Sequence, residues 1–106
     1  MTTIRVLYKP AGGPMELRTI TNTLAACQEL VDGYIEPVTL ATDLVLVCND
    51  EGVIRGLGSN PFLGYNFRGD WFLCGRDEDE FADIPEDTVA WFRQAGMIGE
   101  ARDGRG

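Results

Sequence analysis

Hydrophobic and polar positions along the chain predict about five strands and two helices. Residues 4–8 are apolar and rich in β-branched side chains, and residues 15–20 alternate apolar with polar positions. Two prolines and two glycines lie between them, in residues 9–14, where they favour a loop and resist a strand ladder. The pattern therefore predicts an N-terminal hairpin with a long connection.

Two segments have apolar residues at helical spacing. The first follows a cap at Thr21 or Asn22 and ends at Gly33, where we expect the left-handed stop. Its apolar stripe is formed by Leu24, Cys27, Leu30 and Val31. The second helix is predicted to begin near Pro85, bury Val89 and Phe92, and end at Gly96.

The middle of the chain predicts the remaining strands. Residues 34–40 read as a strand in which Pro37 favours an edge position, and residues 44–48 form the most hydrophobic run, expected in the centre of the sheet. After a turn at 49–52, residues 53–57 are predicted to pair back as a hairpin. Residues 58–70 have no period and predict a long ordered loop, and 71–74 return to a strand.

These elements predict an α+β fold, a mostly antiparallel sheet with two helices packed on it. The 106 residues fit one domain, expected over 1–98, followed by a flexible tail over 99–106. Apolar residues make up 44% of the chain, enough for an ordinary core without disulfides or metal.

The residue types present argue against common enzyme chemistry. The chain has no histidine, and Ser59 is its only serine, so a Ser-His-acid hydrolase is excluded. Cys27, Cys48 and Cys74 form no C-x-x-C pair, which argues against structural zinc and is typical of reduced, buried thiols. With no signal-type segment and no long apolar run, we expect a cytoplasmic protein that is not an enzyme and needs no cofactor.

The charge of the chain limits its partners. Seventeen acidic residues against nine basic ones give a net charge of −8, and Lys9 is the only lysine. We expect no direct binding to nucleic acid, because such binding needs a basic face. An acidic surface suits a basic protein partner instead, although the same charge also serves solubility alone.

Three short motifs resemble a known family. They are Gly33-Tyr34-Ile35-Glu36-x-Val38, Leu46-Val47-x-Asn49-x-Glu51-Gly52 and Gly56-Leu57-x-x-Asn60. Together they resemble the family called domain of unknown function 3846, over roughly residues 3–95. The chain departs from the pattern where a proline is expected before Asn60, since Ser59 stands there and Pro61 follows. The resemblance implies no activity, but it implies a short acidic accessory protein of phages, prophages or plasmids, acting on host defences by binding.

Two segments carry candidate binding residues. In the loop, aromatic rings for stacking, amides for reading polar edges and an arginine for an anion suit a nucleotide-like ligand; they are Asn60, Tyr65, Asn66, Arg68 and Trp71. The structural alternative is that these side chains cover the edge of the core. The second segment is a run of seven acids, Asp77, Glu78, Asp79, Glu80, Asp83, Glu86 and Asp87, which imitates a row of phosphates. Its structural alternative is a solvated loop that leads into a helix cap, and it lacks the ligand spacing of a calcium loop.

We therefore expect a binding protein that inhibits a host defence factor, such as a CRISPR effector or restriction complex, by blocking a basic surface. The acidic segment and the aromatic loop are expected side by side in that inhibitory surface. A sponge that sequesters a signalling nucleotide, in which subunits share the ligand, is the main alternative. A lesser one is a carboxylate-based hydrolase in which Glu36 and Glu51, near Tyr34 and Asn49, do acid–base work.

Overall fold

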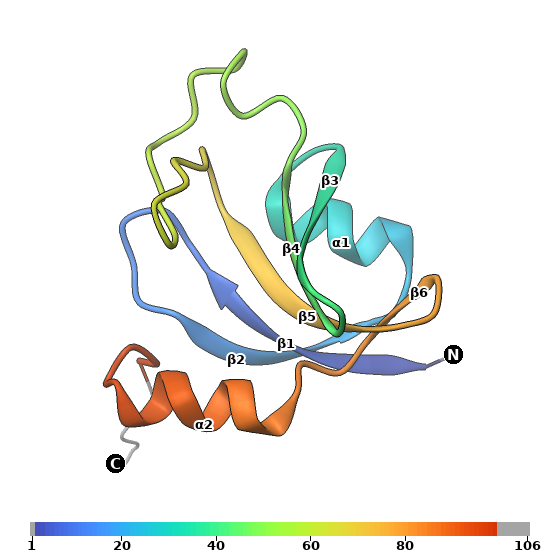
Figure 1. Ribbon diagram of the computed structural model, residues 1–106. Helices are drawn as coiled ribbons and strands as arrows, with labels where there is room; N and C mark the ends of the chain where they lie inside the picture. The colour runs from blue at the N-terminus through green and yellow to red at the C-terminus, as the bar shows by residue number, and fades with distance from the viewer. Residues whose placement is uncertain (1, 100–106) are drawn as a thin grey trace.

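The computed structural model describes residues 2–99 of the chain (Figure 1). Six strands and two helices follow one another as β1 (Thr3–Lys9), β2 (Glu16–Thr21), α1 (Leu24–Val31), β3 (Ile35–Ala41), β4 (Leu44–Asn49), β5 (Trp71–Asp77), β6 (Glu80–Ala82) and α2 (Glu86–Gln94). The strands form one antiparallel sheet in the order β2-β1-β5-β4-β3, and β6 pairs with the end of β5. The predicted α+β fold is confirmed. Of the predicted tail, residues 100–106 lie outside the described residues.

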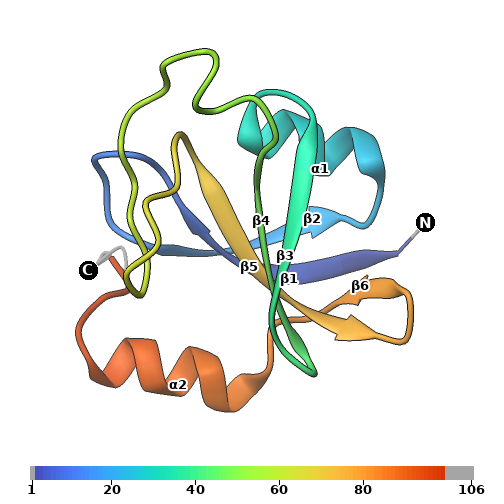
Figure 2. The same ribbon diagram turned by 45° about the horizontal axis from the view of Figure 1, so that its top comes forward.

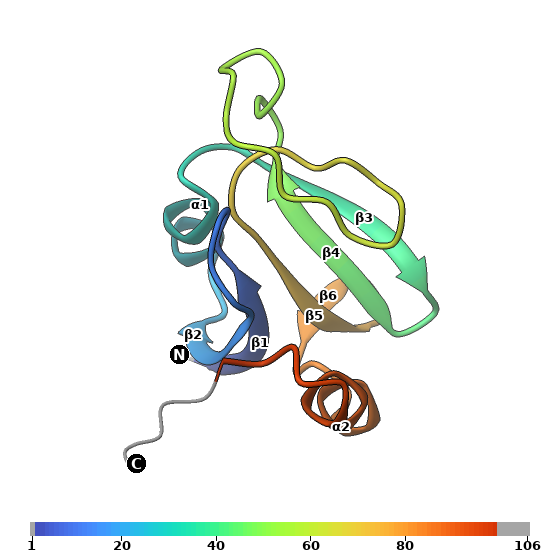
Figure 3. The same ribbon diagram turned by 90° about the vertical axis from the view of Figure 1, so that its left-hand side faces the viewer.

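The sheet carries one helix on each face, so it is buried from both sides (Figure 3). Alternate residues of the central strands point to opposite faces. On β5, Phe72 and Cys74 join the core under α1, whereas Trp71 and Leu73 join the core with α2. This explains why the strands around β5 are hydrophobic at consecutive positions, a pattern typical of strands covered on both faces.

The edges of the sheet agree with the sequence pattern. β3 is an edge strand, which tolerates Pro37 because a proline lacks the N–H that an interior strand would need. β4 lies between β3 and β5, as its uninterrupted apolar run predicted. The hairpin of β1 and β2 is also confirmed, with Ile4 opposite Ile20 and Leu7 opposite Leu17.

The boundaries of α1 differ from the prediction. Thr23 caps the helix, and its hydroxyl accepts a hydrogen bond from the N–H of Ala26 at 3.2 Å. The left-handed residue at the other end is Asp32, with a φ of 63°, rather than Gly33. Gly33 is required for another reason: a Cβ atom there would lie 2.7 Å from Nδ2 of Asn49.

The predicted hairpin over residues 53–57 is wrong. The N–H of Arg55 donates to the carbonyl of Glu51, and the N–H of Leu57 donates to the carbonyl of Gly52, so the segment winds through successive turns. The physical reason is that β4 already pairs with β3 and β5, which leaves it no free edge. The sequence also did not reveal β6, because its acidic surroundings have low strand propensity.

Candidate functional site

The two segments with candidate binding residues lie at opposite ends of β5. The long loop leads into the first residue of this strand, and the acidic segment begins at its last residue, so the two ends lie apart (Figures 1 and 2). A seven-residue strand at about 3.3 Å per residue separates them by roughly 20 Å. The expected combined surface of acids and aromatic rings is therefore corrected to two separate regions.

In the long loop, two of the five candidate residues belong to the core. Trp71 is 1% exposed, and its indole N–H donates to the backbone carbonyl of Asn60 at 2.8 Å. The amide of Asn60, itself 2% exposed, donates to the carbonyls of Lys9 and Gly69 and accepts from the Lys9 ammonium. These contacts tie the loop to β1, so neither side chain presents a face to a ligand.

The other three candidate loop residues lie nearer to the surface. Tyr65 is 59% exposed and stacks against Phe67, with ring centroids 5.8 Å apart. Oδ1 of Asn66 accepts the Ser59 hydroxyl at 2.7 Å. Arg68 donates to the carbonyl of Leu57 at 3.4 Å.

Asn66 and Arg68 line a cavity of about 140 Å³ together with Glu36 and Cys48. Ligand pockets for drug-sized molecules have about 300–1,000 Å³, so this cavity is small for a nucleotide. The sponge interpretation also needs Asn60 and Trp71 at the surface, where the structure does not place them.

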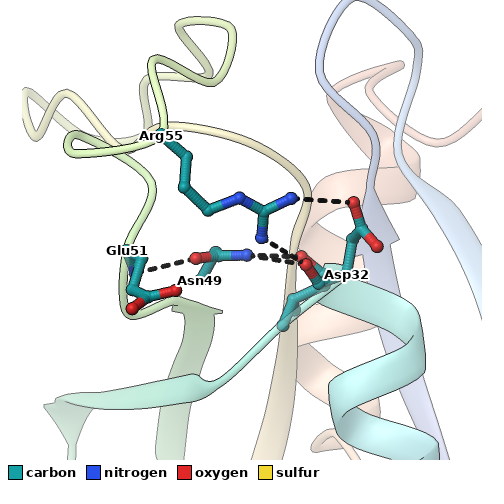
Figure 4. A network of polar contacts seen from close by, with 5 residues as sticks. Asp32, Asn49, Glu51 and Arg55 are labelled. Carbon is teal, nitrogen blue, oxygen red and sulfur yellow. Dashed lines mark hydrogen bonds and ion pairs between the residues drawn. The ribbon is translucent and has the colours of Figure 1, made fainter.

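The residues around Asn49 form a structural clasp (Figure 4). Asn49 is 5% exposed, and its amide donates to the carbonyls of Val31 and Asp32 at 3.0 and 3.1 Å. Its Oδ1 accepts the N–H of Glu51 at 2.7 Å, and Arg55 donates to the carbonyl of Asp32 at 2.6 Å. The clasp holds the end of α1 against the end of β4 and the turns that follow it.

The clasp gives a structural reason for several residues of the three family motifs. Gly33 lets the Asn49 amide approach, and Gly52 avoids a clash, since a Cβ there would lie 2.5 Å from the carbonyl oxygen of Arg68. Within residues 2–99 no hydrogen bond joins the carboxylates of Glu36 and Glu51; Glu36 lines the small cavity, and Glu51 does not. Gly33, Asn49 and Gly52 are therefore explained by folding.

The acidic run divides into two parts. Near α2, Oδ1 of Asp83 accepts the backbone N–H of Arg5 at 2.8 Å, and Glu86 forms an ion pair with the Arg5 guanidinium. Glu86 and Asp87 also occupy the first turn of α2, where carboxylates complement the positive end of the helix. This part serves to attach α2 to β1.

The other part is the acidic hairpin tip, which runs from the last residue of β5 to the first residue of β6 and consists of Asp77, Glu78, Asp79 and Glu80. All four are exposed, and Asp77 lies directly opposite Glu80 in the ladder. Glu78 has a φ of 58°, in the left-handed region that favours glycine. Among the described residues none of these four forms an ion pair, and the one cation at the tip is Arg76, whose guanidinium donates to the backbone carbonyl of Glu78 at 2.9 Å. One positive charge offsets the repulsion between four carboxylates only in part.

The three cysteines are buried thiols. Burial raises the pKa of Cys48 to about 11 and that of Cys74 to about 12, and it also raises the pKa of Cys27. At neutral pH these groups stay protonated and are poor nucleophiles. Within residues 2–99, no group of three or more His, Cys, Asp or Glu side chains could hold a metal ion.

Sequence reasoning did not single out Tyr8 and Asp70. The Tyr8 hydroxyl donates to Oδ2 of Asp70 at 2.7 Å, across 62 positions of the chain. Burial, followed by this hydrogen bond and the charge of Asp70, raises the pKa of Tyr8 to about 12. No local signal could have joined the two residues, because only the pairing of β1 with β5 brings them together.

The protein is therefore a small α+β protein. Among its described residues, a long loop is tied to the core at one end of the sheet, and an acidic hairpin lies at the other end. The chain belongs to the family described as Domain of unknown function (DUF3846), which matches over residues 4–96. No curated protein and no solved structure matches the chain. In the described part of the chain, neither helix has the length and apolar character needed to cross a membrane.

Proposed function

We propose that this protein is a non-enzymatic binding protein that docks its acidic hairpin tip onto a basic surface of a protein partner. The tip is exposed, and the pairing of β5 with β6 holds its four carboxylates in a defined arrangement. Complementary charge of this kind steers association and fixes the orientation of two proteins.

The observation that carries the proposal is the concentration of four carboxylates beside a single cation, Arg76, with none of the four in an ion pair with a described residue. Asp77 faces Glu80 across the ladder, an arrangement that destabilises a hairpin. Glu78 adds backbone strain, since a glycine would adopt its φ of 58° more easily. A basic partner would relieve the repulsion, which gives binding an electrostatic driving force and a strong dependence on salt.

We further propose that the partner is a nucleic-acid-handling defence complex of a bacterial host, such as a CRISPR effector or a restriction complex. Such complexes hold nucleic acid in basic grooves, and a row of carboxylates at a narrow tip can enter a groove built for phosphates. The family resemblance supports the setting, a phage or other mobile element whose protein inhibits the host factor from within the cytoplasm.

The test compares two double variants that change the net charge equally. Asp79→Lys with Glu80→Lys alters the hairpin tip, whereas Glu29→Lys with Glu36→Lys alters α1 and β3. The partner is first identified by co-purification from the host, and its affinity for each purified variant is then measured by calorimetry at 50 and 300 mM salt. We expect the tip variant to lose at least about tenfold in affinity at low salt, and the control to change far less.

Equal losses in both variants would show that only net charge matters and would reject the hairpin as the docking site. Affinity that does not fall between the two salt concentrations would reject the electrostatic mechanism. Catalytic turnover of any substrate by the purified protein would reject the proposal that it acts by binding alone.

A further inference from the structure

A second surface feature, independent of the hairpin tip, is a cleft of about 630 Å³ on the α1 side of the sheet. Its lining residues come from α1, from strands β1 and β2, and from the end of the long loop. The volume lies within the range of small-molecule sites. The residues that matter to the argument are Tyr8, Arg18, Ile20, Glu29, Leu30 and Asp70.

Within this cleft a positively charged side chain of the protein itself, Arg18, lies against an aromatic ring. The Arg18 guanidinium lies over the Tyr8 ring, 4.6 Å from its centroid, while the Tyr8 hydroxyl is fixed by its hydrogen bond to Asp70. An aromatic face next to a carboxylate is a favourable position for a positive group. Arg18 also pairs with Glu16 at 3.1 Å, and its side chain is 46% exposed, so it can leave the ring without unfolding β2.

The charges that line the cleft do not balance. Arg18 is compensated by Glu16, and Asp32 is compensated by Arg55 at 3.3 Å. Glu29 on α1 and Asp70 before β5 form no ion pair with any described residue. Asp70 keeps its full negative charge although its oxygens accept the N–H of Ala11 at 2.9 Å and the hydroxyl of Tyr8 at 2.7 Å, since neither donor is a cation. Two carboxylates from different elements thus give the cleft a negative potential, and its remaining wall includes the apolar side chains of Ile20 and Leu30.

We propose that this cleft binds a small organic cation, an aliphatic amine with two or more ammonium groups on a methylene chain. The ammonium groups would pair with Glu29 and Asp70, and the methylene chain would lie along Ile20 and Leu30. An anionic ligand such as a phosphate ester is disfavoured, because two carboxylates that form no ion pair with a described residue line the same cleft.

The proposal makes an unusual prediction for Arg18. This side chain competes with the ligand for the Tyr8 ring and for the negative potential, so Arg18→Ala should strengthen the binding of an amine. Were the cleft an anion site, the same variant would abolish binding, because Arg18 is the only basic residue among the described residues that line the cleft.

Isothermal titration calorimetry of the full chain with putrescine and with spermidine, at low salt, tests the inference. We expect saturable binding of one molecule per chain, weakened about three- to tenfold by Glu29→Gln and strengthened at least about threefold by Arg18→Ala. Glu80→Gln, on the acidic hairpin tip, is the matched control and should leave the affinity unchanged. Both glutamates are exposed, so neither variant should affect folding.

Equal weakening by Glu29→Gln and Glu80→Gln would indicate diffuse attraction and overturn the site. Non-saturable binding, or weaker binding after Arg18→Ala, would also overturn it. Titration with inorganic phosphate should give no saturable heat; a phosphate signal that Arg18→Ala removes would identify an anion site instead. None of these outcomes depends on whether the hairpin tip binds a partner.

Discussion

Replacement of Asn49 by alanine tests the clasp that joins the end of α1 to the end of β4 and the turns after it. The substitution removes three hydrogen bonds, two donated to the carbonyls of Val31 and Asp32 and one accepted from the N–H of Glu51. Their consequences differ. The carbonyl of Asp32 keeps its bond from Arg55, and the N–H of Glu51 lies near the surface, where water can replace the lost acceptor.

The largest loss of stability comes from the carbonyl of Val31. It belongs to the last turn of α1, where carbonyls have no partner within the helix, and Val31 is 1% exposed. A buried acceptor left without a donor costs about 1–3 kcal/mol, and each replaced bond costs roughly 0.5–1.5 kcal/mol more. We therefore expect Asn49→Ala to lower the free energy of unfolding by about 3 kcal/mol, and the melting temperature by roughly 15 °C.

Urea unfolding followed by tryptophan fluorescence measures the loss, because Trp71 is buried and changes its environment on unfolding. The control is Asn66→Ala, which removes an exposed bond to Ser59 and should change stability by less than about 0.5 kcal/mol. Asn49→Asp keeps the acceptor for Glu51 but loses both donors, so it should destabilise at least as strongly as alanine. If Asn49→Ala and Asn66→Ala unfold within about 1 kcal/mol of each other, the clasp does not stabilise the fold as argued.

Three further predictions concern single groups. Glu78→Gly should raise the free energy of unfolding by roughly 0.5 kcal/mol because it removes left-handed strain, and Glu78→Gln, which removes only the charge, should gain less in the same urea assay. The pKa of Tyr8 is raised to about 12 from an ordinary value of 10, so the folded state holds this proton more tightly. That stability is fully present below pH 10 and is lost between pH 10 and 12, and Tyr8→Phe should flatten the fall in urea midpoints over this range. The three buried thiols should react with a thiol reagent at pH 8 only after denaturant is added, and fast labelling of the native protein would contradict their burial.

The candidate residues show where sequence reasoning reached its limit. An asparagine or tryptophan in a glycine-rich loop satisfies the pattern of a ligand site and that of a buried loop anchor equally well. Asn60 and Trp71 are anchors here, because the loop folds back over the core and the carbonyls of Lys9 and Gly69 need donors. The sequence also could not show that the acidic run divides into a part that attaches α2 and an exposed tip. That division depends on Arg5, which lies near the other end of the chain and pairs with Glu86.

The sequence by itself determined the class of fold, the N-terminal hairpin, the buried strand over residues 44–48 and the helix that begins near Pro85. Each of these depends on local periodicity or on the fixed geometry of proline and glycine, which neighbours along the chain reveal. Only the tertiary structure decided that β4 has no free edge, that the clasp closes on α1, and that Tyr8, Arg18 and Asp70 meet in one cleft. These features join residues distant in sequence, so their energies depend on strand order and on burial, which no local pattern encodes.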